Sequence, residues 1–152
     1  MATMWMEGDR YQIKGVPDRV KMNQLNNLLH DALISTEHVE KCAIIEKKDG
    51  EQKAASPGFN MSKDQILSVL DDFKRCSVIR KEGIFFEEKN YKCIRADKNS
   101  IYAKSLQPGE GGVILVRTNS LVIVATYTEK MFPSVCVEAM EKLGDYFREK
   151  GR

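Results

Sequence analysis

Five basic side chains have the clearest chemical potential in this sequence. They fall on three predicted strands and on the turn that follows the last strand: Lys92, Arg95, Lys104, Arg117 and Lys130. If neighbouring strands bring them to one rim of a sheet, they form a compact cationic patch. Such a patch can bind an anionic lipid headgroup or an acidic protein surface, at roughly 1 kcal/mol per basic residue near a membrane. The alternative interpretation is a set of solvated charges interspersed with acids.

Residue types that usually carry catalysis are scarce. His30 lies outside the apolar stripe of the first predicted helix, which predicts a solvated surface histidine, while His38 follows the helix end, where a capping role or an interaction with the helix dipole suffices. Adjacent acids point in different directions on a helix or a strand and cannot share a site. We therefore interpret two such pairs, Asp71-Asp72 and Glu87-Glu88, as solvated carboxylates. We expect no catalytic residue and no enzymatic activity.

The chain has four cysteines: Cys42, Cys76, Cys93 and Cys136. Successive cysteines are 34, 17 and 43 positions apart, and none forms a CxxC or CxH pair. This spacing predicts reduced thiols and neither a bound metal nor a redox dithiol. A thiol enzyme that uses Cys93 or Cys136 is an alternative, but no motif supplies a base. The glycines at positions 109, 111 and 112 join two predicted strands and do not open a helix, so we expect no nucleotide loop and no cofactor.

Composition excludes several classes of protein. The 152 residues carry a net charge of +2, too small for the basic footprint of a dedicated nucleic-acid binder. The longest apolar run, Leu121 to Ala125, is far shorter than the roughly 20 residues of a spanning helix. The first residues lack the pattern of a secretory signal, which predicts an intracellular protein.

Hydrophobic periodicity predicts three helices. A stripe at i, i+3, i+4, i+7 and i+8 begins at Leu25 in a helix that starts near Met22. A capping box, Ser62 to Gln65, opens a second helix, whose buried side is expected to include Leu67, and Pro133 opens the third.

The other apolar runs predict two strands after the first helix and five consecutive strands before the last. Their short connections join antiparallel neighbours. We predict an α+β fold with an antiparallel sheet of about seven strands, flanked by N- and C-terminal helices plus one further helix. Residues 1–21 have no period and predict an appended arm, which leaves 22–152 as a single domain.

The closing segment, Tyr127 to Gly151, resembles the last strand and helix of profilins, above all at Leu143-Gly144-Asp145-Tyr146. The resemblance extends over Met22 to Arg152, 131 residues. It implies a non-catalytic, monomeric protein of the cytoplasm and cytoskeleton, from a family that generally binds monomeric actin, poly-L-proline and phosphoinositides. Three sequence segments are most similar to the divergent fourth isoform type of animal profilins: residues 55–60, 125–129 and 133–138. This similarity implies acidic phospholipids as ligands and little actin binding.

The resemblance also implies site residues. Those of the actin-facing region are Arg95, Lys104, Arg117 and Glu129, and those of the poly-proline platform are Leu143 and Tyr146. The platform's usual aromatic residues are absent from the first helix, and Lys53 stands where a strand tryptophan is expected. We therefore expect weak or absent poly-proline binding. The alternatives are a conventional profilin, which binds actin and proline-rich partners, and an interaction module that uses its sheet edge.

Overall fold

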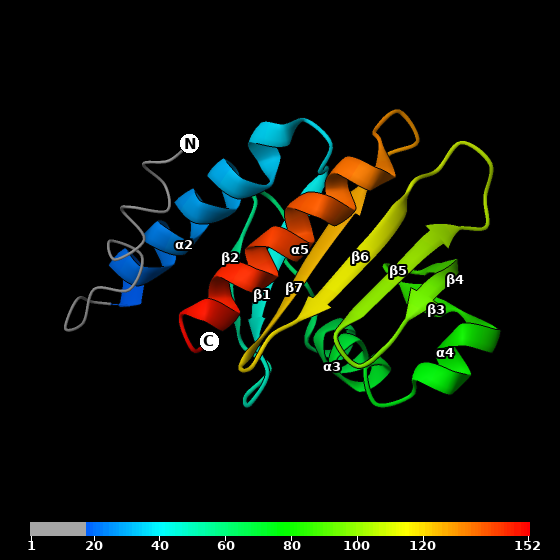
Figure 1. Cartoon of the computed structure of the whole chain (residues 1–152), viewed down its shortest axis with the longest axis horizontal. Helices are drawn as coiled ribbons and strands as arrows, with labels where there is room; N and C mark the ends of the chain where they lie inside the picture. Colours follow the sequence, from blue (N-terminus) through cyan, green and yellow to red (C-terminus); the bar gives the residue numbers. More distant parts are fainter. Residues whose placement is uncertain (1–17) are drawn as a thin grey trace.

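The computed structural model describes residues 18–152, with side chains from residue 23 onward. A helical segment is followed by two strands, two helices, five strands and a last helix, and this is the α+β class expected from the sequence (Figure 1). The helices are α2 (Asp18–Ala32), α3 (Lys63–Asp72), α4 (Cys76–Glu82) and α5 (Pro133–Glu149), with a short 3₁₀ helix η2 (Ile34–Thr36) after α2. The strands are β1 (Lys41–Glu46), β2 (Gln52–Ala55), β3 (Ile84–Phe86), β4 (Lys89–Ala96), β5 (Ser100–Ser105), β6 (Gly112–Arg117) and β7 (Leu121–Tyr127).

All seven strands form one antiparallel sheet in the order β2-β1-β7-β6-β5-β4-β3. Two apolar cores lie on its two faces. Helices α2 and α5 pack with one face, through residues such as Leu28 and Met140, and α3 and α4 pack with the other, through residues such as Val69 and Ile79. Within the described part of the chain, no helix is long and apolar enough to cross a bilayer.

One predicted boundary and the number of helices differ from the structure. Helix α2 begins at Asp18, four residues before Met22, so residues 18–21 of the predicted arm belong to this helix. The rest of that arm, residues 1–17, lies outside the described residues. One further helix was predicted where the structure has two, α3 and α4. Helix α4 has only seven residues and one buried side chain, Ile79, so it carries no apolar stripe that a periodicity argument could detect.

Of the two hydrogen bonds of the predicted capping box, only the one to the Ser62 hydroxyl forms. The Ser62 hydroxyl accepts the backbone N–H of Gln65 at 3.1 Å, which starts α3. The Gln65 side chain does not return to Ser62 but accepts the N–H of Glu87 at 2.8 Å, in the turn between β3 and β4. This amide therefore joins α3 to the neighbouring hairpin.

Candidate functional site

Two exposed lysines face each other on neighbouring strands of the sheet. Lys92 on β4 and Lys104 on β5 are direct cross-strand partners. Side chains in such positions have Cβ atoms about 4.5–5.5 Å apart, and like charges there destabilise the pair. Within the part of the chain that the structure describes, neither lysine has a carboxylate partner. An anion placed between them would relieve this repulsion.

A β-bulge adds a third cation to the same face. The register slips between Cys93 and Arg95, so Ile94 has no partner and Arg95 lies opposite Tyr102. In a regular strand Arg95, three positions after Lys92, would point to the other face. The Arg95 guanidinium lies 5.6 Å from the centre of the Tyr102 ring and 3.0 Å from the Asp97 carboxylate. We refer to Lys92, Arg95 and Lys104 as the basic strip.

Helix α5 holds Tyr102, the aromatic side chain beside the basic strip. Both Tyr102 and Ser100 donate hydrogen bonds from their hydroxyls to the same carboxylate oxygen of Glu141, and the Ser100 bond is 2.8 Å long. Burial, followed by the hydrogen bond to Glu141, raises the pKa of Tyr102 to about 12, so its phenol stays neutral. The strip therefore has a tethered aromatic side chain beside its cations.

The remaining predicted cations lie elsewhere, so the five residues do not form one patch. Arg117 ends β6, whereas Lys104 pairs with Gly112 at the start of that strand, about 17 Å away at 3.3 Å per residue. Arg117 also pairs with Val122, which packs in the core on the α3 side of the sheet. Lys130 lies in the turn after β7. The sequence alone could not separate these cations, because the register of the strands decides on which face and at which end of the sheet each side chain lies.

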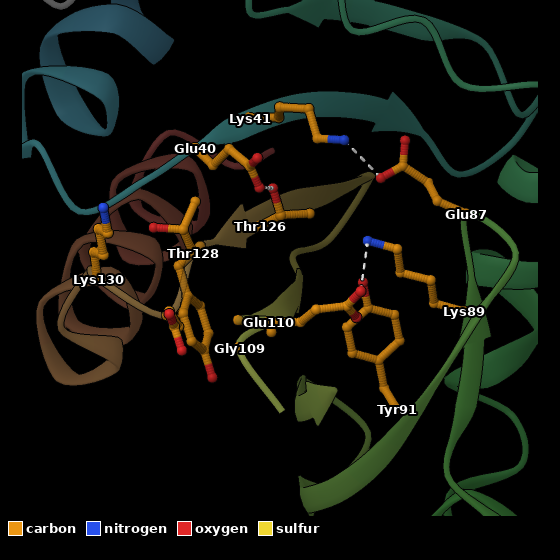
Figure 2. Close-up of a pocket in the computed structure, with 14 residues that line it drawn as sticks. Glu40, Lys41, Glu87, Lys89, Tyr91, Gly109, Glu110, Thr126, Thr128 and Lys130 are labelled. Atoms are coloured by element: carbon orange, nitrogen blue, oxygen red, sulfur yellow. Dashed lines mark hydrogen bonds and ion pairs between the residues drawn. The ribbon is translucent and has the colours of Figure 1, made fainter. Parts of the chain in front are cut away.

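A cavity of about 430 Å³ lies where β1 and β6 begin and β7 ends (Figure 2). Both Lys130 and Glu129, the fourth residue of the implied actin surface, line it. The other charged residues around it are Glu40, Lys41, Glu87, Lys89 and Glu110. Opposite charges are paired there: Lys41 with Glu87 at 2.8 Å and Lys89 with Glu110 at 3.5 Å.

The titration behaviour of this cavity does not suit acid–base chemistry near neutral pH. A hydrogen bond from the Ser105 hydroxyl, at 2.7 Å, lowers the pKa of Glu110, and Lys89 lowers it further. Burial and then Glu87 raise the pKa of Tyr91 to about 12. The acid therefore stays charged and the phenol neutral, so these groups can bind a charged surface but do not exchange protons with it near neutral pH.

Three of the four thiols are poor nucleophiles. Burial raises the pKa of Cys42 and of Cys136 to about 12, and it also raises the pKa of Cys93. The reactive form of cysteine is the thiolate, which is scarce at neutral pH under these conditions. Among the described residues, no group of His, Cys, Asp and Glu could hold a metal ion.

The two histidines act locally. His30 is 67% exposed and lies 3.6 Å from Asp31, as expected of a surface histidine. His38 accepts the backbone N–H of Phe132 at 2.9 Å through Nδ1 and stacks on the Phe132 ring at 4.9 Å. It therefore caps the start of α5, not the end of the helix that precedes it.

The residues implied for poly-proline binding are inside the protein. Leu143 is 1% exposed and Tyr146 is 4% exposed, and both belong to the core that α2 and α5 share. Lys53 on β2 forms an ion pair with Glu51 at 3.2 Å. In this structure neither Leu143 nor Tyr146 presents a surface to a proline-rich segment.

Comparison with known families identifies this combination of sheet and helices. The family described as Profilin matches residues 23–152. The chain belongs to the profilin family. Profilins are non-enzymatic regulators of the actin cytoskeleton, and the family resemblance seen in the sequence is confirmed.

The relatives also agree with the fourth isoform type. The chain is 46% identical to mouse Profilin-4 and 47% identical to cow Profilin-4, in each case over 131 residues that cover 86% of this chain and 99% of the relative. A crystal structure of Acanthamoeba castellanii profilin II has 32% identity and a TM-score of 0.73, covering 84% of this chain and 98% of that one. The predicted profilin fold is therefore confirmed.

Sequence reasoning missed two groups of charged residues in this profilin. Asp72, interpreted as a solvated acid, is only 5% exposed, and burial raises its pKa to about 6. Lys47 and Lys74 lie in a cavity with Arg117, although the three come from separate elements. No motif could have found either group, because both depend on how α3 docks on the sheet.

Proposed function

We propose that this profilin is a non-catalytic regulator of the actin cytoskeleton that binds acidic phosphoinositides through the basic strip. Its affinity for monomeric actin and for poly-proline is reduced or absent, and it acts as a monomer in the cytoplasm and cytoskeleton. The observation that supports this most strongly is the direct pairing of Lys92 with Lys104. Two like charges without carboxylate partners are stabilised by a multivalent anion.

Apolar exposure beside the cations favours a membrane over a soluble anion. Ile94, the bulged residue of β4 just before Arg95, is 63% exposed, and Leu106, just after β5, is 61% exposed. Basic residues next to exposed apolar side chains are typical of surfaces that lie in the headgroup region of a bilayer. Acidic phospholipids are the ligand class that satisfies both features.

Two observations support weak binding of the other family ligands. Leu143 and Tyr146 are buried, so a proline-rich segment would have to displace core packing in order to reach them. The four residues implied for actin are dispersed. Lys104 pairs with the first residue of β6, whereas Arg117 is the last residue of that strand. A reduced actin contact follows from this dispersal.

A conventional profilin is the second candidate. Solved complexes include mouse profilin IIa with a double repeat from the FH1 domain of mDia1, and LokiProfilin2 with rabbit actin, at 16% and 14% identity and TM-scores of 0.66 and 0.68. At that identity they support a shared fold alone. The observation that favours this candidate is Phe132, which is 63% exposed at the start of α5 and could contact a protein partner.

Vesicle co-sedimentation tests the proposal. Phosphatidylcholine vesicles containing a bisphosphorylated phosphoinositide are compared with phosphatidylcholine alone, at low and physiological salt. We expect binding to the anionic vesicles that weakens with salt, and a roughly tenfold loss in Lys92→Ala/Lys104→Ala. The matched control is Lys81→Ala/Lys142→Ala, which removes two exposed lysines elsewhere. Unchanged vesicle binding by the strip variant would show that the site is misplaced.

A further inference from the structure

A second cationic surface lies on the other side of the sheet from the basic strip. A cavity of about 610 Å³ lies at the ends of β1 and β6 and the start of β7, beside α3. Three cations line it: Lys47, just after β1, Lys74, just after α3, and Arg117, the last residue of β6. We refer to it as the basic cavity.

The positive charge of the basic cavity is not neutralised from within. Lys47 donates from Nζ to the backbone carbonyls of Thr118, at 3.1 Å, and Asn119, at 2.8 Å, so its ammonium group is held in place without a carboxylate. Burial and then the neighbouring Arg117 lower the pKa of Lys47. Within the described part of the chain, Lys74 and Arg117 have no carboxylate partner either.

The acid that lines this cavity is already engaged. Asp71 pairs with Arg75 one helical turn away, at 3.4 Å. Three cations from three elements thus surround a space that contains one neutralised carboxylate. A ligand with several phosphates separated by a few ångströms would match this arrangement better than a single small anion.

The cavity also has an apolar side that opens to solvent. Phe73 and Val122 are buried beneath it, but Leu67 is 50% exposed, contrary to the expectation that it lies on the buried side of α3. An exposed leucine beside three cations suits a ligand that is anionic at one end and apolar at the other. An acidic peptide could provide the charge, but only a lipid provides a continuous apolar phase next to it.

We propose that the basic cavity is a second phosphoinositide site, which holds the phosphorylated inositol ring between Lys47, Lys74 and Arg117 while Leu67 contacts the acyl region. The inference rests on the proposed lipid-binding function and deepens it, because it assigns a separate headgroup site to Arg117. A volume of this size is within the range of pockets that enclose small ligands. Since the basic cavity and the basic strip lie on opposite faces of the sheet, they are separate sites for the headgroup.

The experiment uses the full chain and two probes, soluble inositol trisphosphate and vesicles that contain a bisphosphorylated phosphoinositide. Lys74→Ala/Arg117→Ala leaves Lys47, which holds the β6–β7 turn, in place. We expect binding of both probes at the basic cavity to weaken about tenfold in this variant, while the basic strip keeps its own binding. Leu67→Ser should weaken vesicle binding alone, because soluble inositol trisphosphate has no acyl chains. Urea unfolding establishes that each variant is folded, and Lys81→Ala/Lys142→Ala is the charge-matched control.

The outcomes separate this proposal from the proposed function. If wild-type protein binds the vesicles and only Lys92→Ala/Lys104→Ala loses that binding, the cavity assignment is wrong and the lipid function stands. Failure of folded wild-type protein to bind either probe would overturn both. Displacement of inositol trisphosphate by inorganic phosphate at equal concentration, or binding of an acidic phosphopeptide without binding of vesicles, would also overturn the lipid assignment of the cavity.

Discussion

Lys92 of β4 and Lys104 of β5 are direct cross-strand partners, and neither has a carboxylate partner in the part of the chain that the structure describes. Like charges in this arrangement oppose strand pairing. A protein that keeps such a pair at its surface is less stable without an anionic ligand than with one. An anion bound between the two lysines would therefore raise the stability of the fold.

Replacing Lys104 with glutamate tests this coupling. Lys104→Glu turns a repulsive cross-strand pair into an attractive one, so the free energy of unfolding should rise by about 0.5 kcal/mol while vesicle binding falls. Urea denaturation measures the first effect and co-sedimentation the second. Lys81→Glu, on exposed α4, is the control for a charge change alone. A lower unfolding free energy in Lys104→Glu would contradict the repulsion.

The buried carboxyl of Asp72 predicts a pH dependence of stability. Burial raises its pKa from 3.8 to about 6. Because the folded state binds the proton more tightly than the unfolded state, this group's favourable contribution is complete below pH 3.8 and is lost as the pH rises through about 6. Asp72→Asn, which stays neutral, should raise the unfolding free energy at neutral pH by roughly 2 kcal/mol.

The measurement is a set of urea unfolding curves across that pH range. The difference between Asp72→Asn and wild type should shrink as the pH falls below about 6. Asp71→Asn is the matched control, since the carboxylate of Asp71, next to Asp72 in the sequence, is exposed and pairs with Arg75. A constant difference at every pH would mean that Asp72 does not titrate in this range.

The turn between β3 and β4 holds two non-glycine residues in the left-handed region. Glu87 has a φ of 49° and Glu88 a φ of 64°. Left-handed backbone costs an ordinary residue roughly 1–2 kcal/mol, and glycine adopts it freely. Glu88→Gly should therefore raise the unfolding free energy by about 0.5–1 kcal/mol, after the greater chain entropy of glycine is included. The opposite result is expected for Glu138→Gly, which places glycine inside α5.

Poly-proline retention reports on Leu143 and Tyr146. Because both are buried, this profilin should pass through a poly-L-proline column without being retained. Leu143→Ala should lower the unfolding free energy by about 2–5 kcal/mol, as for a core leucine. Retention of the wild type, and its loss in a folded Leu143→Ala variant, would instead place this side chain in a proline-binding surface.

Sequence patterns predicted the sheet well and its surface poorly. The last of the five consecutive strands predicted before the final helix forms as β7, because a mostly apolar run between turn formers specifies a buried strand. Helix α4 was missed, because a seven-residue helix with one buried side chain has no period. Family motifs identified the fold, since they depend on core and turn residues that the fold itself requires.

The candidate site could be predicted only in part, for geometric reasons. Strand order placed Lys92 and Lys104 on neighbouring strands, and their opposition follows from the register. The bulge at Ile94, which turns Arg95 to the same face, leaves no local mark in the sequence. A shared rim of neighbouring strands predicts Arg117 beside the other cations, whereas Arg117 at the end of β6 lines the cavity beside α3.

The central claim is that anionic lipid takes the place of actin as the principal ligand of this profilin. Titration of the purified protein into labelled monomeric actin, beside vesicle binding in the same buffers at low and physiological salt, tests it most directly. The account predicts saturable, salt-sensitive binding to phosphoinositide vesicles and no saturation with actin at micromolar protein. Micromolar or tighter actin binding by the folded protein, together with no vesicle binding, would contradict the account and establish a conventional profilin.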